Sequence, residues 1–279
     1  MNHPKPNITV NVDVTNPGQF FACCGLLELA DRLWPGAEVM GGFISPRFQR
    51  SQFNIWSKHS LDTQTIVTCL CRSQRNAVEP LQAIKKDGKV VKDVSKIKPI
   101  QLTIERDDGA VNEPVSMRLN WWLDELTGQQ QDHFKLWSAH VSSQSLIADM
   151  ANAIHPEKIN DETVFEYSCP MTGRIGLDAR SSWNTLDEGF SPNNQGLKVE
   201  SFPAAELLAA IGLQYFIPLE GDGFAYVCWN RPLPTVVARA AVAGCVGLSG
   251  ASWYRFQVAA RGRFKYFTKA SPYERNNND

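Results

Sequence analysis

Hydrophobic and polar residues alternate at the start of the chain and then give way to an almost wholly apolar stretch. Residues 8–14 alternate, which indicates a half-buried strand. Asn16 is a suitable helix cap and Pro17 suits a first turn, so a helix is predicted over 19–33. That helix is apolar on nearly all sides, which predicts burial against a sheet. A strand over 38–48 completes a β-α-β unit.

The middle of the chain is less regular, and a lysine-rich stretch over 85–98 is predicted to be solvated. Its predicted elements are a helix over 53–60, a strand over 65–71, a hairpin over 100–106 and 110–117, helices over 120–126 and 130–154, and strands over 163–167 and 173–177.

The last part returns to clear patterns after a polar loop over 178–196. Its predicted elements are a strand over 197–202, a helix over 204–216 between two prolines, a strand over 224–229, an apolar helix over 235–246, and a final strand pair over 253–260 and 263–268.

The first and last parts share a short similarity, because residues 19–26 align with residues 206–213. One interpretation is that two buried helices share a common apolar pattern. The other is a duplicated β-α-β core, as in proteins made of two ferredoxin-like halves, in which the shared glycine lets each helix approach a sheet. The predicted fold class is therefore α+β, with an N-terminal core and helical middle over 1–160 and a C-terminal core over 161–279.

Composition narrows the class of protein. The chain has 279 residues, of which 43% are hydrophobic and 20% are charged, as in folded globular proteins. A net charge of -1 argues against a free-standing, strongly basic DNA-binding protein, although a locally basic surface is compatible with it. The seven cysteines, with no signal peptide and no apolar run long enough for a bilayer, predict reduced thiols in a cytoplasm.

Catalytic and metal-binding patterns are weak. No cysteine pair has the spacing of a structural zinc site, and His133 and His140 are flanked by polar residues that fit a solvated helix face. The glycine-rich stretch over 244–250 lacks the lysine of a phosphate-binding loop and fits a helix end followed by a turn, although its glycines also suit a backbone approach to phosphate. We therefore predict no enzyme activity, no metal and no cofactor.

Positive charge is concentrated in the last part of the chain. Between residues 239 and 275 there are seven cations against Glu274 alone, an excess of 7 − 1 = +6. They are Arg239, Arg255, Arg261, Arg263, Lys265, Lys269 and Arg275. In a strand, Arg261, Arg263 and Lys265 lie on one side and Phe264 and Tyr266 on the other, so one side can pack on a core while the other contacts phosphates. The alternative is a charged outer face that only keeps the protein soluble.

A second polar stretch lies over 174–183. Arg174, Asp178 and Arg180 are close enough in sequence to form a local ion-pair set, which is often structural. The exposed loop that follows is a usual place for binding residues.

Two of these stretches resemble a known family. Residues 16–33, NPGQFFACCGLLELADRL, resemble the opening of the short CRISPR-associated proteins of type I-G (formerly I-U) systems. These form the third of the Csb families and are also described as short Cas-eight-like subunits (Dpsyc subtype). Residues 176–183 and 186–193 are similar to a second block of that family, and residues 254–256 and 263–266 match its end only weakly. Residues 50–160 have no match.

The resemblance implies a subunit of a Cascade-type complex. Such a complex carries a CRISPR RNA, opens target DNA by base pairing and recruits a separate helicase-nuclease, while its proteins read a short PAM and the shape of the hybrid. The resemblance leaves open whether this subunit reads the PAM or lines the RNA as a RAMP protein does. RAMP folds use ferredoxin-like halves and a glycine-rich loop, which is compatible with the internal similarity and with residues 244–250.

Together these patterns predict a non-catalytic, cytoplasmic nucleic-acid-binding subunit whose partners are CRISPR RNA, target DNA, the other Cascade subunits and the helicase-nuclease, with no membrane contact. The alternatives are a purely structural bridging subunit and a RAMP-type ribonuclease that processes CRISPR RNA. The predicted nucleic-acid contacts are Arg255, Arg261, Arg263, Lys265 and Lys269, assisted by Arg174 and Arg180.

Overall fold

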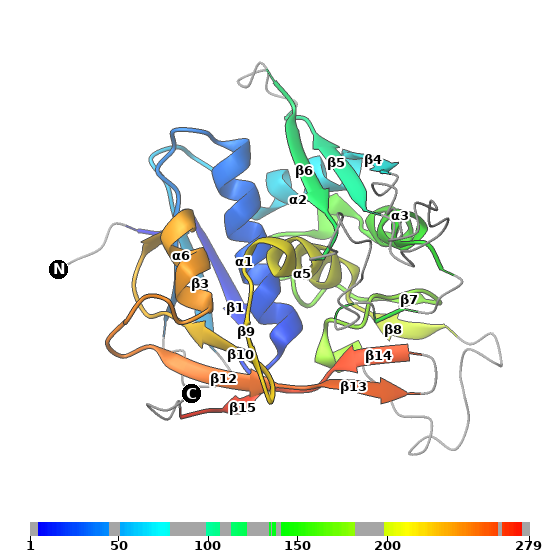
Figure 1. Ribbon diagram of the computed structural model, residues 1–279. Coiled ribbons are helices and arrows are strands. Elements are labelled where there is room, and N and C mark those ends of the chain that lie inside the picture. Colours follow the sequence, from blue (N-terminus) through cyan, green and yellow to red (C-terminus); the bar gives the residue numbers. More distant parts are fainter. Residues whose placement is uncertain are drawn as a thin grey trace, which may run out of the picture.

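The computed structural model confirms an α+β fold in which helices pack against several antiparallel sheets (Figure 1). It describes residues 5–44, 51–78, 99–106, 113–121, 134, 136–137, 141–181, 198–261 and 264–274. The helices are α1 (Pro17–Leu33), α2 (Thr63–Arg72), α3 (Ser143–Ala153), α5 (Pro203–Tyr215) and α6 (Thr235–Val242), with the short 3-10 helices η2 (Pro156–Lys158) and η3 (Ala179–Ser181).

The strands form five antiparallel groups, with the orders β1-β3-β2-β11, β15-β12-β10-β9, β4-β5-β6, β7-β8 and β13-β14. Their bounds are β1 (Ile8–Val12), β2 (Met40–Ile44), β3 (Ser51–Trp56), β4 (Gln74–Ala77), β5 (Ile100–Ile104), β6 (Val115–Leu119), β7 (Cys169–Met171), β8 (Val199–Ser201), β9 (Leu219–Gly221), β10 (Gly223–Cys228), β11 (Leu233–Pro234), β12 (Ser252–Phe256), β13 (Val258–Arg261), β14 (Phe264–Phe267) and β15 (Ser271–Pro272).

Helix α1 lies at the centre of the molecule, as its apolar sequence predicts (Figure 1). It begins at Pro17, and the side chain of Asn16 caps it by accepting a hydrogen bond from the amide of Gly18 at 3.0 Å. The ring of Phe20 stacks on Phe43 of β2 and on Tyr226 of β10, so α1 joins two sheets in one core. Because aromatic side chains bury the largest apolar areas, these contacts anchor the fold.

The two similar sequence stretches occupy different sheet arrangements. In the first, α1 connects β1 to β2, and the order β1-β3-β2 is that of a split β-α-β unit. In the second, α5 connects β8 to β9, but β8 pairs with β7 while β9 belongs to the β10 sheet. The two units therefore share the helix and the hairpin that follows it, but not the strand order.

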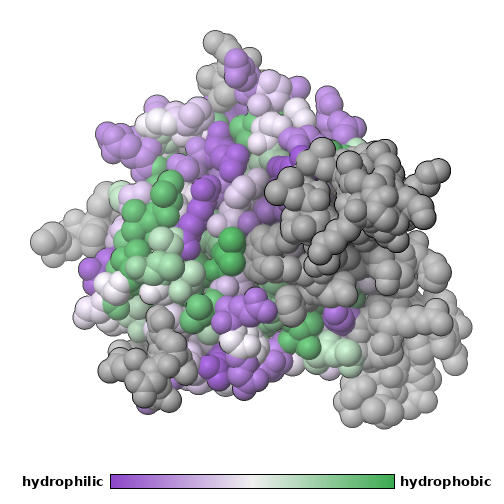
Figure 2. Space-filling model, in the orientation of Figure 1, coloured by the Kyte–Doolittle hydropathy of each residue, from purple (hydrophilic) through white to green (hydrophobic). Residues whose placement is uncertain are grey.

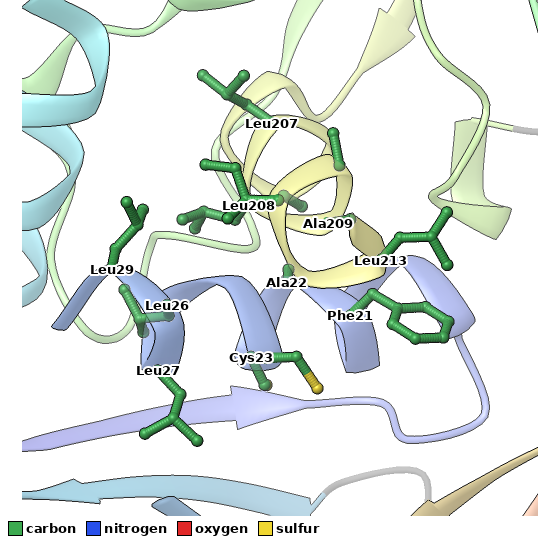
Figure 3. Packing of buried hydrophobic residues seen from close by; sticks show 14 of the residues in the cluster. Phe21, Ala22, Cys23, Leu26, Leu27, Leu29, Leu207, Leu208, Ala209 and Leu213 are labelled. Carbon is green, nitrogen blue, oxygen red and sulfur yellow. The ribbon is translucent and has the colours of Figure 1, made fainter. Parts of the chain in front are cut away.

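Helices α1 and α5 pack on one another through buried apolar side chains (Figure 3). The glycine shared by the two stretches lies where their backbones meet. A Cβ on Gly25 would lie 2.0 Å from the carbonyl oxygen of Leu208, and a Cβ on Gly212 would lie 1.8 Å from that of Phe21. The prediction that each glycine lets its helix approach a sheet is therefore wrong. The glycines instead let the two helices approach one another, with reciprocal contacts at matching positions.

The two predictions just after the first unit are wrong in type. Residues 53–60 were expected to be helical but contain most of strand β3, whose apolar residues are buried because the strand pairs with both β1 and β2. Residues 65–71 were expected to be a strand but form helix α2, which Asp62 caps by accepting from the amide of Thr65 at 2.8 Å. The predicted hairpin is confirmed, because β5 and β6 pair antiparallel.

Two further predicted strands are absent from the described residues. Residues 163–167 form turns because the side chain of Asn160 accepts hydrogen bonds from the amides of Glu162 and Thr163, both at 2.9 Å. Residues 173–177 form no strand, since the amides of Gly176 and Leu177 bond to a buried carboxylate, that of Glu206, at 3.0 and 3.1 Å.

The core continues across the predicted boundary at residue 160, since β11 from the second part pairs with β2 from the first. The division into two domains stays a prediction. The lysine-rich residues 85–98, residues 122–126 of the helix predicted over 120–126, and His133 and His140 lie outside the described residues. Within the described ranges, no helix combines the length and apolar character needed to cross a membrane.

Candidate nucleic-acid interface

Strand β12 carries Arg255 on the side of the sheet that faces away from the core. Its neighbours Tyr254 and Phe256 are buried and point inward, so the pleat directs Trp253 and Arg255 outward. The guanidinium carbon of Arg255 lies 3.7 Å from the centroid of the Tyr273 ring. In the described part of the chain, no carboxylate forms an ion pair with Arg255. This predicted contact residue is therefore stacked on an aromatic ring at a half-buried position.

The hairpin of β13 and β14 carries the next predicted residues. Arg261 is the last residue of β13, Lys265 is half-buried on β14, and Arg263 lies outside the described residues. The hairpin is tied to neighbouring segments, because the amide of Lys265 donates to the carbonyl of Leu136 at 2.9 Å and that of Phe267 donates to Gly176 at 3.0 Å. These bonds place β14 beside the segment that contains Arg174 and Arg180.

The predicted division of β14 into a polar and an apolar side is wrong at its end. Alternation places Phe267 on the same side as Lys265, yet Phe267 is fully buried and Tyr266 only half-buried. Phe267 packs against Phe256, with ring centroids 4.7 Å apart, which explains why this side faces the core there.

Arg180 is held in place from several directions. Its guanidinium donates to both carboxylate oxygens of Asp178, at 3.1 and 2.8 Å, and to the carbonyl of Phe165 at 2.5 Å. The guanidinium also donates to the carboxylate of Glu166 at 3.2 Å. Its central carbon lies 3.6 Å from the centroid of the Phe202 ring. The predicted Asp178–Arg180 pair is confirmed as a structural element. Arg174 is half-buried in the same segment.

Asp178 connects this segment to the start of α1. The Asn16 amide donates to Asp178 at 2.7 Å, while its oxygen accepts from the amide of Ala179 at 3.1 Å. A Cβ on Gly18 would lie 2.5 Å from the Cα of Asp178, so only glycine fits there. The two stretches that carry the family resemblance, around residues 16–18 and 177–180, therefore pack directly on one another.

Glu206 on α5 completes this buried network. Its carboxylate accepts from the amides of Gly176, Leu177 and Asp178, at 3.0 to 3.1 Å, and it is fully buried. Burial, together with the nearby charge of Asp178, raises the pKa of Glu206 to about 7, although the three amides act in the opposite direction. These hydrogen bonds hold residues 176–180 in place, and the carboxylates of Asp178 and Glu206 are buried.

Lys269 and Arg180 line the same cavity, which has a volume of about 610 Å³. The other lining residues are Asn11, Val12, Asp13, Gln19, Glu162 and Glu166. The ammonium of Lys269 lies 3.7 Å from a carboxylate oxygen of Asp13. Because three carboxylates face two cations there, a phosphate gains little attraction in this cavity. The structure thus brings Arg180 and Lys269 together, but each beside an acidic partner.

Arg239, which contributes to the cationic excess in the sequence, is neutralised by a buried carboxylate. Two of its nitrogens bond to the carboxylate of Glu28, at distances from 2.5 to 3.0 Å. Glu28 is fully buried and also accepts from Arg32 at 2.6 Å. Burial and the charge of Glu28 raise the pKa of the neighbouring Asp31. The Arg239 side chain is 31% exposed, but its charge is paired with this buried carboxylate, which makes it a poor candidate for a phosphate contact.

Sequence reasoning missed the buried carboxylates Glu28 and Glu206, whereas it named Asp178 as a member of an ion-pair set. A signal for both was present, since a glutamate within an otherwise apolar helix implies a buried partner. Their partners include Arg239 and the amides of residues 176–178, which come from distant segments that the sequence did not indicate.

Groups suited to nucleophilic or metal chemistry do not converge in the described part of the chain. The thiols of Cys23, Cys24 and Cys228 are buried, and burial raises their pKa well above the ordinary value, which keeps them protonated. In the same ranges, no group of three or more metal-ligating side chains is found. The glycine-rich residues after α6 form a turn before β12, as one of the two interpretations predicted.

No protein-family model, curated protein or solved structure matches this chain. The chemistry of its own residues therefore carries the assignment of function.

Proposed function

We propose that the protein is a non-catalytic, cytoplasmic subunit of a Cascade-type CRISPR surveillance complex, which binds CRISPR RNA and target DNA and contributes to PAM recognition. The observation that carries the proposal is the outward position of Arg255 on β12, next to the cation-bearing hairpin of β13 and β14. Arginine held at a surface by an aromatic ring is well suited to contact a polyanion.

The family resemblance adds support. The two stretches on which it rests pack on one another through Asn16, Gly18 and Asp178, so these residues have a shared structural reason to occur together. The partners in this proposal are the other Cascade subunits and the helicase-nuclease that such a complex recruits.

Charge reversal on the hairpin tests the proposal. Binding of the full chain to a fluorescein-labelled single-stranded DNA or RNA is measured by anisotropy between about 50 and 200 mM salt. We expect the Arg261→Glu, Arg263→Glu double variant to bind more weakly and to lower the slope of log K against log salt by about two, one for each phosphate contact. A slope equal to that of the wild type contradicts the assignment of these two residues.

Arg231→Glu is the matched control. Arg231 is exposed in the loop before β11, where its guanidinium donates to the carbonyl of Ser249 at 3.2 Å. The same change of charge there is expected to leave the salt slope unchanged.

A purely structural bridging role is the second candidate, and one observation favours it. Helix α6 exposes apolar side chains, with Val236 70% and Val237 37% exposed. Figure 2 shows hydrophobic residues gathered on the left of the view, where α6 lies. Exposed apolar surface of this kind often marks a protein contact. Ultraviolet crosslinking of the assembled complex separates the two roles, because a bridge yields no peptides of this chain crosslinked to nucleic acid.

A further inference from the structure

Three side chains form a small outward-facing patch on the C-terminal sheet, which we call the stacking patch: Trp253, Arg255 and Tyr273. All three are half-buried. The Arg255 guanidinium lies 3.7 Å from the centre of the Tyr273 ring, and the Trp253 and Tyr273 rings meet edge to face with centroids 6.3 Å apart. The patch therefore presents three flat groups, with Tyr273 in contact with each of the other two.

The sheet backbone fixes the positions of these groups. Trp253 and Arg255 alternate along β12 with Tyr254 and Phe256, which are 2% and 1% exposed and belong to the core. Tyr273 follows the short strand β15, and its amide donates to the carbonyl of Trp253 at 3.0 Å. Side chains on a paired strand are held more rigidly than those on a loop, so little ordering is needed on binding.

The chemistry of the patch points to bases more than to phosphates. Indole, phenol and guanidinium groups are planar and stack on the faces of nucleic-acid bases, whatever the sequence of those bases. A group that served only to attract phosphate would need no aromatic neighbours. The charge of Arg255 adds attraction for the backbone at the same place.

We propose that the stacking patch binds unpaired bases of single-stranded nucleic acid. This inference rests on the proposed function and specifies its ligand, because bases within a duplex are stacked on one another and present no free face to the sheet. The ligand class is therefore a single-stranded segment of RNA or DNA, and a purely double-stranded one is excluded.

The experiment compares three fluorescein-labelled probes of equal length with the full chain at one salt concentration. The probes are a single strand, the same strand with abasic sugars at its central positions, and the duplex. We expect the wild type to prefer the normal single strand to the abasic strand by roughly tenfold, the effect of about one stacked base. The salt dependence of the two strands should be similar, because their phosphates are the same.

Conservative variants test each part of the patch. Arg255→Lys keeps the charge but loses the planar group, and Tyr273→Leu removes the ring, so each should reduce the preference for the normal strand from roughly tenfold to less than about threefold. Tyr273→Phe keeps the ring and should retain the preference. Arg231→Lys is the matched control at a remote exposed arginine. Circular dichroism and thermal melting show that each variant is folded.

The outcomes separate this inference from the proposed function. If the wild type binds both strands equally and salt still weakens the binding, the stacking patch is rejected and the proposed function stands. If the wild type binds none of the probes, both are rejected. If Arg255→Lys and Tyr273→Leu both retain the full preference, bases are bound elsewhere on the protein and the patch is again rejected.

Discussion

Arg239 and Arg255 belong to the same run of cations in the sequence and both are half-buried, yet their partners differ. Arg239 pairs with the fully buried carboxylate of Glu28, whereas Arg255 lies on the outer side of a sheet and stacks on Tyr273. Around α1 and α5, the buried carboxylates of Glu28 and Glu206 both have partners from distant segments. The outer face of β12 pairs its cation with a ring. A charge count along the sequence does not separate these two roles, because it contains no information on partners.

The largest expected effect comes from removing the buried carboxylate of Glu28. Glu28→Ala leaves Arg239 and Arg32 without their carboxylate, and breaking a buried ion pair from one side costs about 3 to 5 kcal/mol. Chemical denaturation should show this loss in the free energy of unfolding. Glu38→Ala is the matched control, because the Glu38–Lys58 pair is exposed and its loss should cost less than about 1 kcal/mol. Equal losses in the two variants would show that the pair of Glu28 and Arg239 is no stronger than an exposed one.

A substitution where α1 and α5 cross should lower the free energy of unfolding almost as much. Gly212→Ala places a methyl group where the carbonyl oxygen of Phe21 would lie 1.8 Å away, so α1 and α5 must move apart, at a cost of about 3 kcal/mol (Figure 3). Gly247→Ala is the control, since nothing lies within 4 Å of a Cβ at that position. A stable Gly212→Ala variant would mean that the two helices do not approach at these glycines.

The buried carboxylate of Glu206 predicts a pH dependence of stability. Its pKa rises from an ordinary value of 4.5 to about 7 on folding, so between these values the folded state holds a proton that the unfolded state has released. Stability is therefore highest below pH 4.5 as far as Glu206 is concerned and falls as pH rises through 7. The free energy of unfolding of the wild type, relative to Glu206→Gln, should fall by about 2 kcal/mol from pH 5 to pH 7. If this difference in the free energy of unfolding stays constant or rises with pH, the raised pKa of Glu206 is contradicted.

The elements that sequence predicted well are those with strong local signals. The helix cap Asn16 and the prolines that flank α5 act within a few residues, and α1 and α5 were found, as was the hairpin of β5 and β6. Helix α2 was missed although its cap was present, because its β-branched residues favour a strand and the one-sided burial of Ile66, Val67 and Leu70 is decided by the tertiary fold.

The candidate site was only partly predictable for the same reason. Arg255 was named as a predicted contact from the count of cations, but nothing in the sequence linked it to Tyr273, which reaches it through the pairing of β12 with β15. The ion pairs of Arg239 and Lys269 depend on Glu28 and Asp13, more than 200 residues earlier in the chain. Long-range partners determine which cations are available at the surface, and local patterns do not contain them.

The smallest expected effect belongs to Lys269, which lies between the two environments. Its side chain is 61% exposed and its ammonium lies 3.7 Å from the Asp13 carboxylate, so the pair is loose and its loss should change the free energy of unfolding by less than about 1 kcal/mol. If Asp13 holds the charge of Lys269 within the cavity, Lys269→Gln should leave the salt slope of nucleic-acid binding nearly unchanged, while Arg255→Gln lowers it by about one. Anisotropy titrations of the two variants, made at the same salt concentrations, measure this difference. A drop of about one for Lys269→Gln would instead extend the interface from β12 to the mouth of the cavity, because a lysine that exchanges its carboxylate for a phosphate releases one counterion from the nucleic acid.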